Sequence, residues 1–529
     1  MEPDGCGMGN TQRPAREPSA SQETVSEDLM ANQPTPPRSV KEPSYTDAII
    51  PLVTLIILIA GSVYLFGADA VEGPMQVALI LSVMVTSFII LKNGHPWEAI
   101  VKSSQAALSS LASPIFILLA VGALIGAWNM SGTIPTLVVY GIQLLRPSYF
   151  YVATALICGV ISLGTGSSWT TAGTIGVGLI GIASLVGVSP AITAGAIISG
   201  AYVGDKISSL SETTILAAQL AEVDIHTHIR AAIWTSGPAF IIALLVFAIL
   251  GLLESGVTNG ANIAVDLAGL DQLFWISPLN LIPLVALLIL SLRKAPASLA
   301  VMGSALLAGV MAAILQPQAV LSFVNDPALP APLAQIKGIW LALATGYRSS
   351  SGIPELDQLL SRGGMASMLK TLWIIIGAVT FGTLLEEFNL LSKLTLPMLK
   401  RAKSTGSLIA TVVATAFGLN IVAADQYIAI VLPARLFRAE FRKRGLKPQN
   451  LSRACADAGT VTSPLVPWNS CGAYMAATLG VATMAYLPFC IFNIASPLIS
   501  MLWGFTGFKI EHMQAGEVPA ESIPSRQKV

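Results

Sequence analysis

The chain has 529 residues, of which 53% are hydrophobic and 11% are charged; its formal net charge is zero and its mean hydropathy is +0.71. A soluble domain carries about 25% charged residues, so this composition excludes an ordinary soluble protein and indicates a polytopic protein of the lipid bilayer. No long basic tract occurs, which argues against nucleic acid as a partner.

Apolar runs near the ~20 residues that span a bilayer recur along the chain after a polar segment at 1–46. That segment is rich in Pro, Ser and Glu, and we expect it to be a disordered cytoplasmic tail. The clearest apolar runs lie at 48–66, 73–91, 110–128, 232–253, 277–292, 296–315, 368–385 and 479–503. With shorter and interrupted runs between them, the pattern predicts an all-α polytopic fold of about 10–13 membrane-crossing or re-entrant elements.

Charged loops predict how the chain is oriented and divided. Loops that carry Lys and Arg face the cytoplasm, and three such loops occur at 293–294, 393–403 and 435–453. Glu254, Asp266 and Asp271 make the loop between the two halves acidic, so we place it outside the cell. The predicted domains are the cytoplasmic tail at 1–46, a first transmembrane half at 47–253, an external loop at 254–276, a second transmembrane half at 277–508 and a C-terminal tail at 509–529.

The segment "SLIATVVATAFGLNIVAADQYIAIVLPARLF" at 407–437 has a cytoplasmic loop on both sides. One straight helix cannot return to the side from which it started. The sequence therefore predicts a break, supplied by "GLN" at 418–420 and "AADQ" at 423–426. Broken backbone at membrane depth is tolerated only where protein or a polar cavity satisfies its amides and carbonyls, which points to a binding site.

The two halves share an internal repeat. The stretch "YVGDKISSLSETTILAA" at 202–218 aligns with "GTVTSPLVPWNS" at 459–470 at an offset of 255 residues, and "SLGTGSSWT" at 162–170 aligns with "AFGLNIVAADQ" at 416–426 at an offset of 254. Paired interrupted segments are typical of transporters that bind their substrate between inverted repeats. We therefore predict two inverted repeats, each with a broken helix and a re-entrant hairpin; the competing explanation is a chance match of small residues.

Polar side chains concentrate at these breaks. An ionisable group at the centre of a membrane helix costs about 2.5–3.5 kcal/mol, so each one is a functional candidate. Sodium needs several oxygen ligands, and carboxylate, hydroxyl, amide and carbonyl oxygens supply them. The predicted ion-binding residues are Asp205, Ser208, Ser211, Glu212, Thr213, Thr214, Asn420, Asp425, Thr462, Ser463 and Asn469, with Na+ held at Asp205 and Asp425.

Glycines and hydroxyl residues around the breaks are predicted to support this site. They are Gly164, Thr165, Gly166, Ser167, Ser168, Gly204, Gly418 and Gly459. A carboxylate in such a site can be neutralised by Na+ or by H+, and competition between the two is a minimal antiport mechanism. No P-loop occurs, so the driving force is predicted to be an ion gradient.

Simpler structural roles compete with these assignments. The small Ser and Thr residues could serve only close helix packing. Asp205 could pair with Lys206 at the membrane edge, and Glu212 could be a loop carboxylate. For Asp457, one turn after Arg453, we favour a salt bridge with that arginine. The five scattered cysteines form no CxxC pair and no cluster with the four histidines, so we predict neither a disulfide framework nor a zinc site, and no cofactor.

Four stretches together resemble the NhaC family of Na+/H+ antiporters, within the ion transporter superfamily. They are "GAYVGDKISSLSETTILAA", "AADQYIAIVLPARLF", "KRGLKPQNLSRACADAGTVTSPLVPWNSCGAYMAATLGV" and "GTGSSWTTAGTIG", and the resemblance covers roughly residues 45–508. It implies a bacterial inner-membrane carrier, not an enzyme, that exchanges Na+ or Li+ for H+ by alternating access. A homodimer is a further expectation.

The chain departs from the family pattern at one place. The family's common "SPLSDTTN" stands here as "SSLSETTI", so Ser209 replaces a Pro, Glu212 an Asp and Ile215 an Asn. Relatives of the family exchange organic acids, so the alternative function is a proton- or Na+-coupled exchanger of malate, lactate or amino acids. An intramembrane aspartyl protease is disfavoured because Tyr202 replaces the first Gly of a Gly-x-Gly-Asp motif, and a channel would not need two broken halves.

Overall fold

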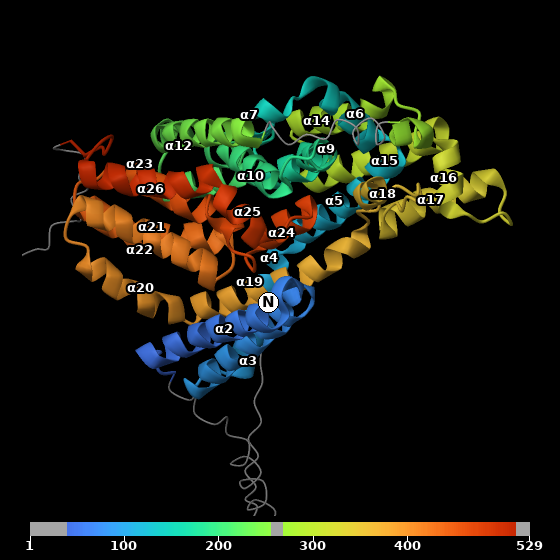
Figure 1. The fold of residues 1–529 in the computed structure, drawn as a ribbon. Coiled ribbons are helices and arrows are strands. Elements are labelled where there is room, and N and C mark those ends of the chain that lie inside the picture. The colour runs from blue at the N-terminus through green and yellow to red at the C-terminus, as the bar shows by residue number, and fades with distance from the viewer. Residues whose placement is uncertain (1–39, 255–267, 515–529) are drawn as a thin grey trace, which may run out of the picture. The chain divides into compact units, whose positions relative to one another are not determined.

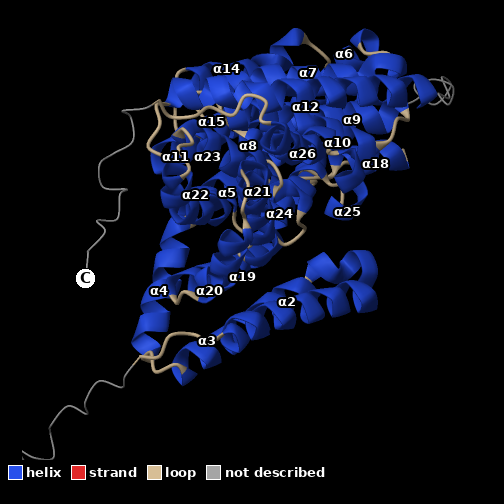
Figure 2. Cartoon of the chain, turned by 90° about the vertical axis from the view of Figure 1, so that its left-hand side faces the viewer, coloured by secondary structure: helices blue, strands red, loops and turns tan. Residues whose placement is uncertain are grey.

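A computed structural model describes residues 40–254 and 268–514 of the chain. Within these residues the secondary structure is helical, apart from an isolated bridge between Leu446 and His512 (Figure 2). The all-α prediction is therefore confirmed for the described part. The expected tails at 1–46 and 509–529, and the expected loop at 254–276, lie largely outside the described residues.

Helices fill the first half of the described chain (Figure 1). The α-helices are α2 (Tyr45–Phe66), α3 (Pro74–Lys92), α4 (Trp97–Ser110), α5 (Ala112–Met130), α6 (Thr133–Leu144), α7 (Pro147–Thr165), α8 (Ser168–Thr171), α9 (Val177–Val186), α10 (Pro190–Ile207), α11 (Glu212–Leu220) and α12 (Ile225–Glu254). A 3-10 turn, η1 (Gly67–Glu72), follows α2, and a π-helical turn, η2 (Ala172–Gly176), joins α8 to α9.

The second half is more interrupted. Its α-helices are α14 (Ile282–Leu292), α15 (Ala297–Leu315), α16 (Pro317–Val324), α17 (Ala331–Thr345), α18 (Pro354–Leu360), α19 (Leu369–Glu387), α20 (Leu390–Arg401), α21 (Thr405–Val422), α22 (Gln426–Lys443), α23 (Pro448–Cys455), α24 (Ser470–Leu479), α25 (Thr483–Tyr486) and α26 (Ile491–Thr506). The short 3-10 and π turns are η3 (Pro278–Leu281), η4 (Met365–Met368), η5 (Ala456–Thr460), η6 (Ser463–Leu465) and η7 (Leu487–Phe489).

Eight helices in the described residues are long and apolar enough to cross a membrane, or nine if a bent pair counts as one span. The polytopic prediction is thus confirmed. The bent pair is Thr483–Phe489 with Ile491–Thr506, at an angle of 55°. The apolar run expected at 479–503 is therefore not one straight helix, because the chain turns at Cys490 between η7 and α26.

Local sequence explains where the central helices begin. Ser189 caps α10 by accepting from the Ile192 amide, and Pro190 takes the first helical position, where no amide donor is needed. Ser404 and Ser407 form a reciprocal capping box at the start of α21. Both helices then continue as apolar segments that reach the polar breaks.

The broken segments of the two halves pack against one another. Helix α10 contacts α7, α12 and α26, while α21 contacts α22, α26 and η5. Figure 1 shows α10, α12 and α26 of the two halves lying in neighbouring layers. Elsewhere α5 packs on α15, and α2 packs on α3, which contacts α19. Helices from both halves therefore surround the polar segments of α10, η5 and α22.

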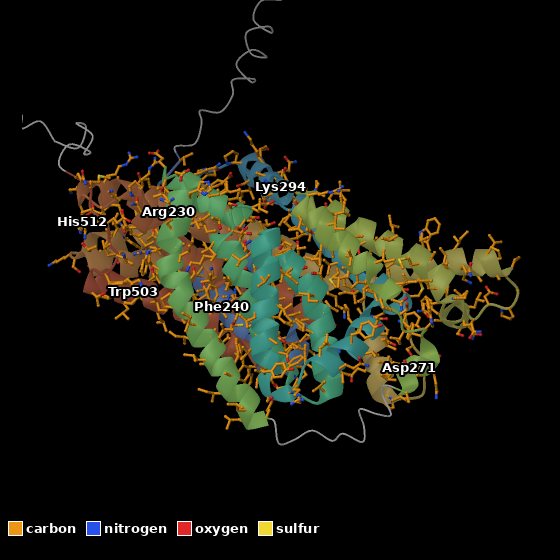
Figure 3. The ribbon with its side chains drawn as sticks, turned by 90° about the horizontal axis from the view of Figure 1, so that it is seen from above. Arg230, Phe240, Asp271, Lys294, Trp503 and His512 are labelled. Atoms are coloured by element: carbon orange, nitrogen blue, oxygen red, sulfur yellow. The ribbon has the colours of Figure 1, made fainter. Side chains whose placement is uncertain are left out.

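Three charged residues near helix ends can be followed in one view. In Figure 3, Arg230 and Lys294 lie toward one edge of the view, and Asp271 lies toward the opposite edge. Arg230 is near the start of α12, whose other end is Glu254. The side of the membrane on which each loop lies stays a prediction.

Candidate ion-binding site

Asp205 lies in the last turn of α10 and is 6% exposed. The end of a helix carries unsatisfied carbonyls and partial negative charge, so a buried carboxylate there adds to a negative region. Such a position is unfavourable for an isolated anion and favourable for one that holds a cation.

Hydroxyl groups from two elements surround this carboxylate. Ser211 Oγ donates to Asp205 Oδ1 at 2.8 Å, and Thr213 Oγ1 does so at 3.0 Å. From α8, Ser168 Oγ donates to Asp205 Oδ2 at 2.5 Å. The carboxylate is therefore held by three side chains that are themselves buried.

The backbone carbonyl of Asp205 gathers the same group of oxygens. Ser211 Oγ, Thr213 Oγ1 and Thr214 Oγ1 lie 2.6, 2.9 and 2.9 Å from it. Each hydroxyl has one hydrogen, yet Ser211 and Thr213 each lie within hydrogen-bond distance of both the carbonyl and the carboxylate. Carboxylate, carbonyl and hydroxyl oxygens crowd one spot, which is the donor set that a hard cation requires.

A tight turn after α10 brings these hydroxyls back to Asp205. Ser208 ends α10, and its hydroxyl donates to the Leu163 carbonyl of α7 at 2.9 Å. Ser211 then caps α11 by accepting from the Thr214 amide at 3.3 Å. Ser208 therefore holds the turn against α7, and its hydroxyl forms no hydrogen bond with the Asp205 carboxylate.

Glycines permit the close approach of α7 and α10. A Cβ on Gly204 would lie 2.1 Å from the Ser162 carbonyl carbon, so no larger residue fits without displacing α7. Gly166 has φ +70° and ends α7; a Cβ there would lie 2.6 Å from the Leu210 carbonyl carbon. The break after α7, with Ser167 capping α8, thus lies against the turn after α10. Gly164 and Thr165 are the last two residues of α7, directly before the break.

The second half is broken at Ala423–Asp425, between α21 and α22. Ala424 adopts φ +54°, and Asp425 caps α22 by accepting from the Tyr427 and Ile428 amides at 2.8 and 3.1 Å. The predicted break at 423–426 is confirmed. The break expected at 418–420 is wrong, because α21 continues through Gly418 to Val422.

Asn420 and Asn469 form a second polar cluster at this break. Asn420 Nδ2 donates to the Gly459 carbonyl at 2.8 Å and to Thr462 Oγ1 at 3.0 Å. Asn469 Nδ2 donates to the Asn420 side-chain and backbone oxygens, both at 3.1 Å. The side-chain amides of Asn420 and Asn469 donate to the oxygens of this cluster, so the cluster stabilises the break. The Asp205 cluster offers more oxygens to a cation. Gly459 lets η5 approach α22, since a Cβ there would lie 2.8 Å from the Ala429 carbonyl.

We call the Asp205 cluster of the first half and the Asn420–Asp425 break of the second half the two half-sites. Two contacts join them. Tyr202, one turn before Asp205, lies 3.4 Å from Ser463 through their hydroxyls, and Ser463 Oγ lies 3.4 Å from Gln426 Oε1. The Tyr427 hydroxyl donates to Glu212 at 3.0 Å. Tyr202, Gln426 and Tyr427 were not predicted from the sequence; their position within a turn of Asp205 and Asp425 was the available signal.

Four roles considered from the sequence need correction or restriction. Glu212 is exposed and bonds Tyr427, so it lies outside the hydroxyl cluster around Asp205. Asp205 does not pair with Lys206, because Lys206 forms a buried ion pair with Asp457. The salt bridge expected between Asp457 and Arg453 is therefore replaced by one that joins the two halves. No hydrogen bond places Asp425 in the Asp205 cluster, and within the described residues no three His, Cys, Asp or Glu side chains gather as a metal site.

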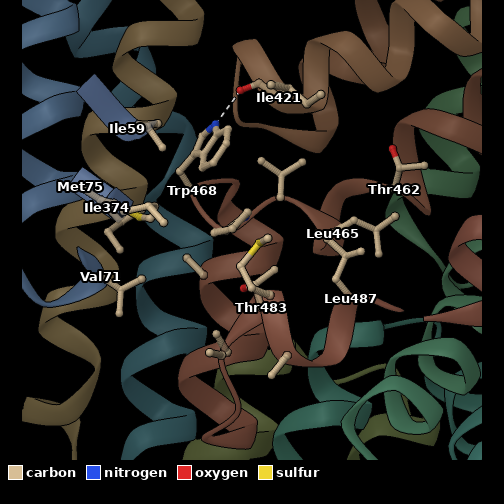
Figure 4. A pocket seen from close by; sticks show the side chains of 18 of the residues that line it. Ile59, Val71, Met75, Ile374, Ile421, Thr462, Leu465, Trp468, Thr483 and Leu487 are labelled. Atoms are coloured by element: carbon tan, nitrogen blue, oxygen red, sulfur yellow. Dashed lines mark hydrogen bonds between the residues drawn. The ribbon is translucent and has the colours of Figure 1, made fainter. Parts of the chain in front are cut away.

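A cavity of about 1750 Å3 lies between α2, α3 and α19 on one side and α21, α24, α25 and α26 on the other (Figure 4). Its lining is mostly apolar, with Glu72 and Lys370 paired with each other at its border. Thr462, which bonds Asn420, lines the cavity. Trp468 lines it too, and its Nε1 donates to the Ile421 carbonyl at 2.7 Å. The cavity therefore borders the second break, while Asp205 lies away from its lining.

Comparison with known proteins gives the family. A family model described as Na+/H+ antiporter family matches residues 200–508. The Na+/H+ antiporter NhaC of Alkalihalophilus pseudofirmus is 35% identical over 442 residues, which cover 84% of this chain and 91% of that protein. The chain belongs to the NhaC family of Na+/H+ antiporters. The family predicted from the sequence motifs is thereby confirmed.

Antiporters named for other substrates are similar to the chain as well. The malate-2H+/Na+-lactate antiporter of Bacillus subtilis is 32% identical over 495 residues, 92% of this chain and 100% of that protein. The arginine/ornithine antiporter ArcD of Halobacterium salinarum is 34% identical over 492 residues, 91% of this chain and 96% of that protein. A second family model, described as C4-dicarboxylate anaerobic carrier, matches residues 11–253.

Proposed function

We propose that the protein is a secondary Na+/H+ antiporter, not an enzyme, which works by alternating access in the bacterial inner membrane. Membership of the NhaC family supports this function. Na+ and H+ are then transported ions, and no cofactor takes part. Li+ is a second candidate substrate because the same oxygen ligands suit it.

The observation that carries the proposal is the oxygen cluster at Asp205. Asp205 contributes Oδ1 and its carbonyl oxygen, and the hydroxyls of Ser211, Thr213 and Thr214, which lie within hydrogen-bond distance of one or both, bring the number of oxygens to five. When Na+ is bound, these oxygens replace its water. When a proton is bound instead, the carboxyl is neutral and no longer attracts the cation. One carboxylate thus serves both ions in turn, which is sufficient for obligatory exchange.

Asp425 is the proposed second carboxylate of the site. Its Oδ1 accepts from both capping amides, so Oδ2 is free of the helix cap and can face a cation. Asn420, Thr462, Ser463 and Asn469 of the second half, with the glycines of both breaks, would keep the backbone open around it. The two halves, 47–253 and 277–508, would act as inverted repeats.

An exchanger of organic acids or amino acids is the second candidate, favoured by the malate/lactate and arginine/ornithine relatives. A bound carboxylate substrate would need a basic partner at the site. Lys206, the basic residue next to Asp205, is engaged by Asp457. This engagement favours the cation as substrate.

Everted membrane vesicles test the function directly. Vesicles that carry the protein are energised to an acid interior, and a pH-sensitive dye records whether Na+, Li+ or K+ dissipates the gradient. We expect dissipation by Na+, loss of it in Asp205→Asn, and parental rates in the matched control Asp326→Asn, whose carboxylate lies in an exposed loop paired with Lys337. No response to any cation, with a response to malate, lactate or arginine, would overturn the cation assignment.

Lipid contact and oligomeric state complete the proposal. The membrane-length helices α2 and α12 have exposed apolar faces, as expected of helices that contact lipid. A homodimer remains a prediction, to be measured by the mass of the detergent-solubilised protein.

A further inference from the structure

Lys206 and Asp457 form an ion pair in which neither side chain is exposed to solvent. Lys206 is the residue after Asp205 on α10, and Asp457 lies in the π-helical turn η5 of the other half. Other ion pairs between the two halves of the described chain, such as Arg438 with Glu222, are partly exposed. Lys206 and Asp457 therefore link the half-sites at the level where the ion is proposed to bind.

The Lys206 ammonium is fully supplied with polar partners, whereas Asp457 accepts through Oδ1 and its buried Oδ2 accepts no hydrogen bond. Lys206 Nζ donates to Ser496 Oγ of α26 at 2.7 Å and to Thr235 Oγ1 of α12 at 3.1 Å, in addition to Asp457. Thr235 Oγ1 in turn donates to Asp457 Oδ1 at 2.8 Å. An ammonium has three hydrogens, and all three have acceptors. Four elements, α10, α12, α26 and η5, are thus joined at one point.

The position of the pair couples it to the cation site. A displacement of the end of α10 moves Asp205, whose carbonyl and carboxylate are the proposed ligands, because Lys206 is its direct neighbour. A displacement of η5 moves Gly459 and Thr462, which hold Asn420. An error of about 1 Å in the placement of such groups can cost a site two orders of magnitude in efficiency.

We propose that Lys206 and Asp457 are positioning residues that hold the two half-sites in register, so that the cation is bound by both. This inference rests on the proposed ion binding at Asp205 and adds the residues that set its geometry. A buried pair contributes little net stability compared with apolar residues of the same size, whereas removal of one partner leaves an uncompensated charge. The pair's function is therefore to fix the position of α10 against η5.

The experiment separates positioning from folding with the double variant Lys206→Met/Asp457→Leu, which removes both charges together. Antiport is measured in everted vesicles as a function of Na+ concentration. We expect the double variant to reach the membrane in parental amount, with an apparent KM for Na+ raised at least tenfold and kcat changed much less. The reversed pair, Lys206→Asp/Asp457→Lys, is expected to recover part of the affinity. A purely structural pair predicts a parental KM in the folded double variant, which would overturn the inference.

A second readout does not depend on Na+ transport. Tyr202→Cys and Ser463→Cys introduce thiols at positions whose hydroxyls lie 3.4 Å apart across the half-sites. We expect a short thiol-specific cross-linker to join them rapidly when Lys206 and Asp457 are intact and slowly in the Met/Leu background. Equal rates would overturn the inference. If the rates differ but the parent shows no Na+-dependent exchange, the positioning stands and the proposed antiport fails.

Glu222→Gln is the matched control for both measurements. Glu222 forms two exposed ion pairs between the halves, with Arg438 and Arg442. Exposed pairs contribute little because water screens them. We expect this variant to keep the parental KM and the parental cross-linking rate.

Discussion

Ser168 and Asp205 are 37 residues apart in the chain, and Ser168 Oγ donates to Asp205 Oδ2 at 2.5 Å. Ser168 begins α8 directly after the break that follows α7, and Asp205 lies in the last turn of α10. The broken segment thus supplies a donor to the buried carboxylate. Through this contact, the two polar stretches of the first half form one site.

Ser168→Ala is expected to weaken Na+ binding. Without this donor the ionised carboxylate is less stabilised, so a proton competes better for Asp205. A hydrogen bond to a charged group contributes about 1.5–3 kcal/mol, so the apparent KM for Na+ should rise about tenfold or more. The measurement is the Na+ dependence of dye recovery in everted vesicles. Thr174→Ala is the control, because Thr174 bonds only carbonyls of its own segment; equal KM values in the two variants would remove Ser168 from the site.

Thr214→Val tests whether the Thr214 hydroxyl, which bonds the Asp205 carbonyl, is part of the cation site. The substitution keeps the shape of the side chain and removes the hydroxyl, whose hydrogen bond is to that carbonyl. We expect a severalfold rise in the apparent KM for Na+, because one oxygen ligand is lost while Asp205 keeps its charge. The amount of folded protein in detergent should stay parental. A variant with unchanged ion dependence would show that the hydroxyl serves the helix turn alone.

Asp425→Asn isolates the charge of Asp425 from its role as a helix cap. Asn caps helices as well as Asp does, so α22 should keep its start and the protein its expression. Loss of the carboxylate is expected to abolish Na+-dependent exchange. Asp425→Ala should in addition lower stability by about 1 kcal/mol through loss of the cap, measured as a lower thermal transition in detergent. Parental transport by the Asn variant would restrict Asp425 to capping.

Asp224 makes the start of α12 sensitive to acid. Its carboxylate accepts from the Thr227 and His226 amides, and these bonds hold the pKa of Asp224 below its usual value of 3.8. A lowered native pKa means that the contribution to stability is present above the ordinary pKa and is lost as pH falls through the native one. We expect Asp224→Asn to match the parent at low pH and to be less stable at neutral pH. Thermal transitions at several pH values check this; a constant difference would contradict it.

Much of the architecture could be predicted from hydropathy. The apolar runs at 48–66, 73–91 and 110–128 are the helices α2, α3 and α5, because a bilayer imposes both length and composition on a crossing helix. The break at 423–426 was predictable from polar residues with cytoplasmic flanks on both sides. The expected break at Gly418 was not found, since one glycine inside an apolar helix costs only about 1 kcal/mol, which is too little to end it.

The sequence by itself determined the class of the protein, its family and the place of Asp205 among hydroxyl residues, because composition and local motifs are properties of neighbours in the chain. Only the tertiary structure decided which distant groups meet. Lys206 could have paired with the adjacent Asp205, and Asp457 with Arg453 one turn away. Instead Lys206 and Asp457 pair across the halves. The physical reason is direction: successive residues on α10 point to different neighbours, so Asp205 faces α8 and α11 while Lys206 faces α12, α26 and η5.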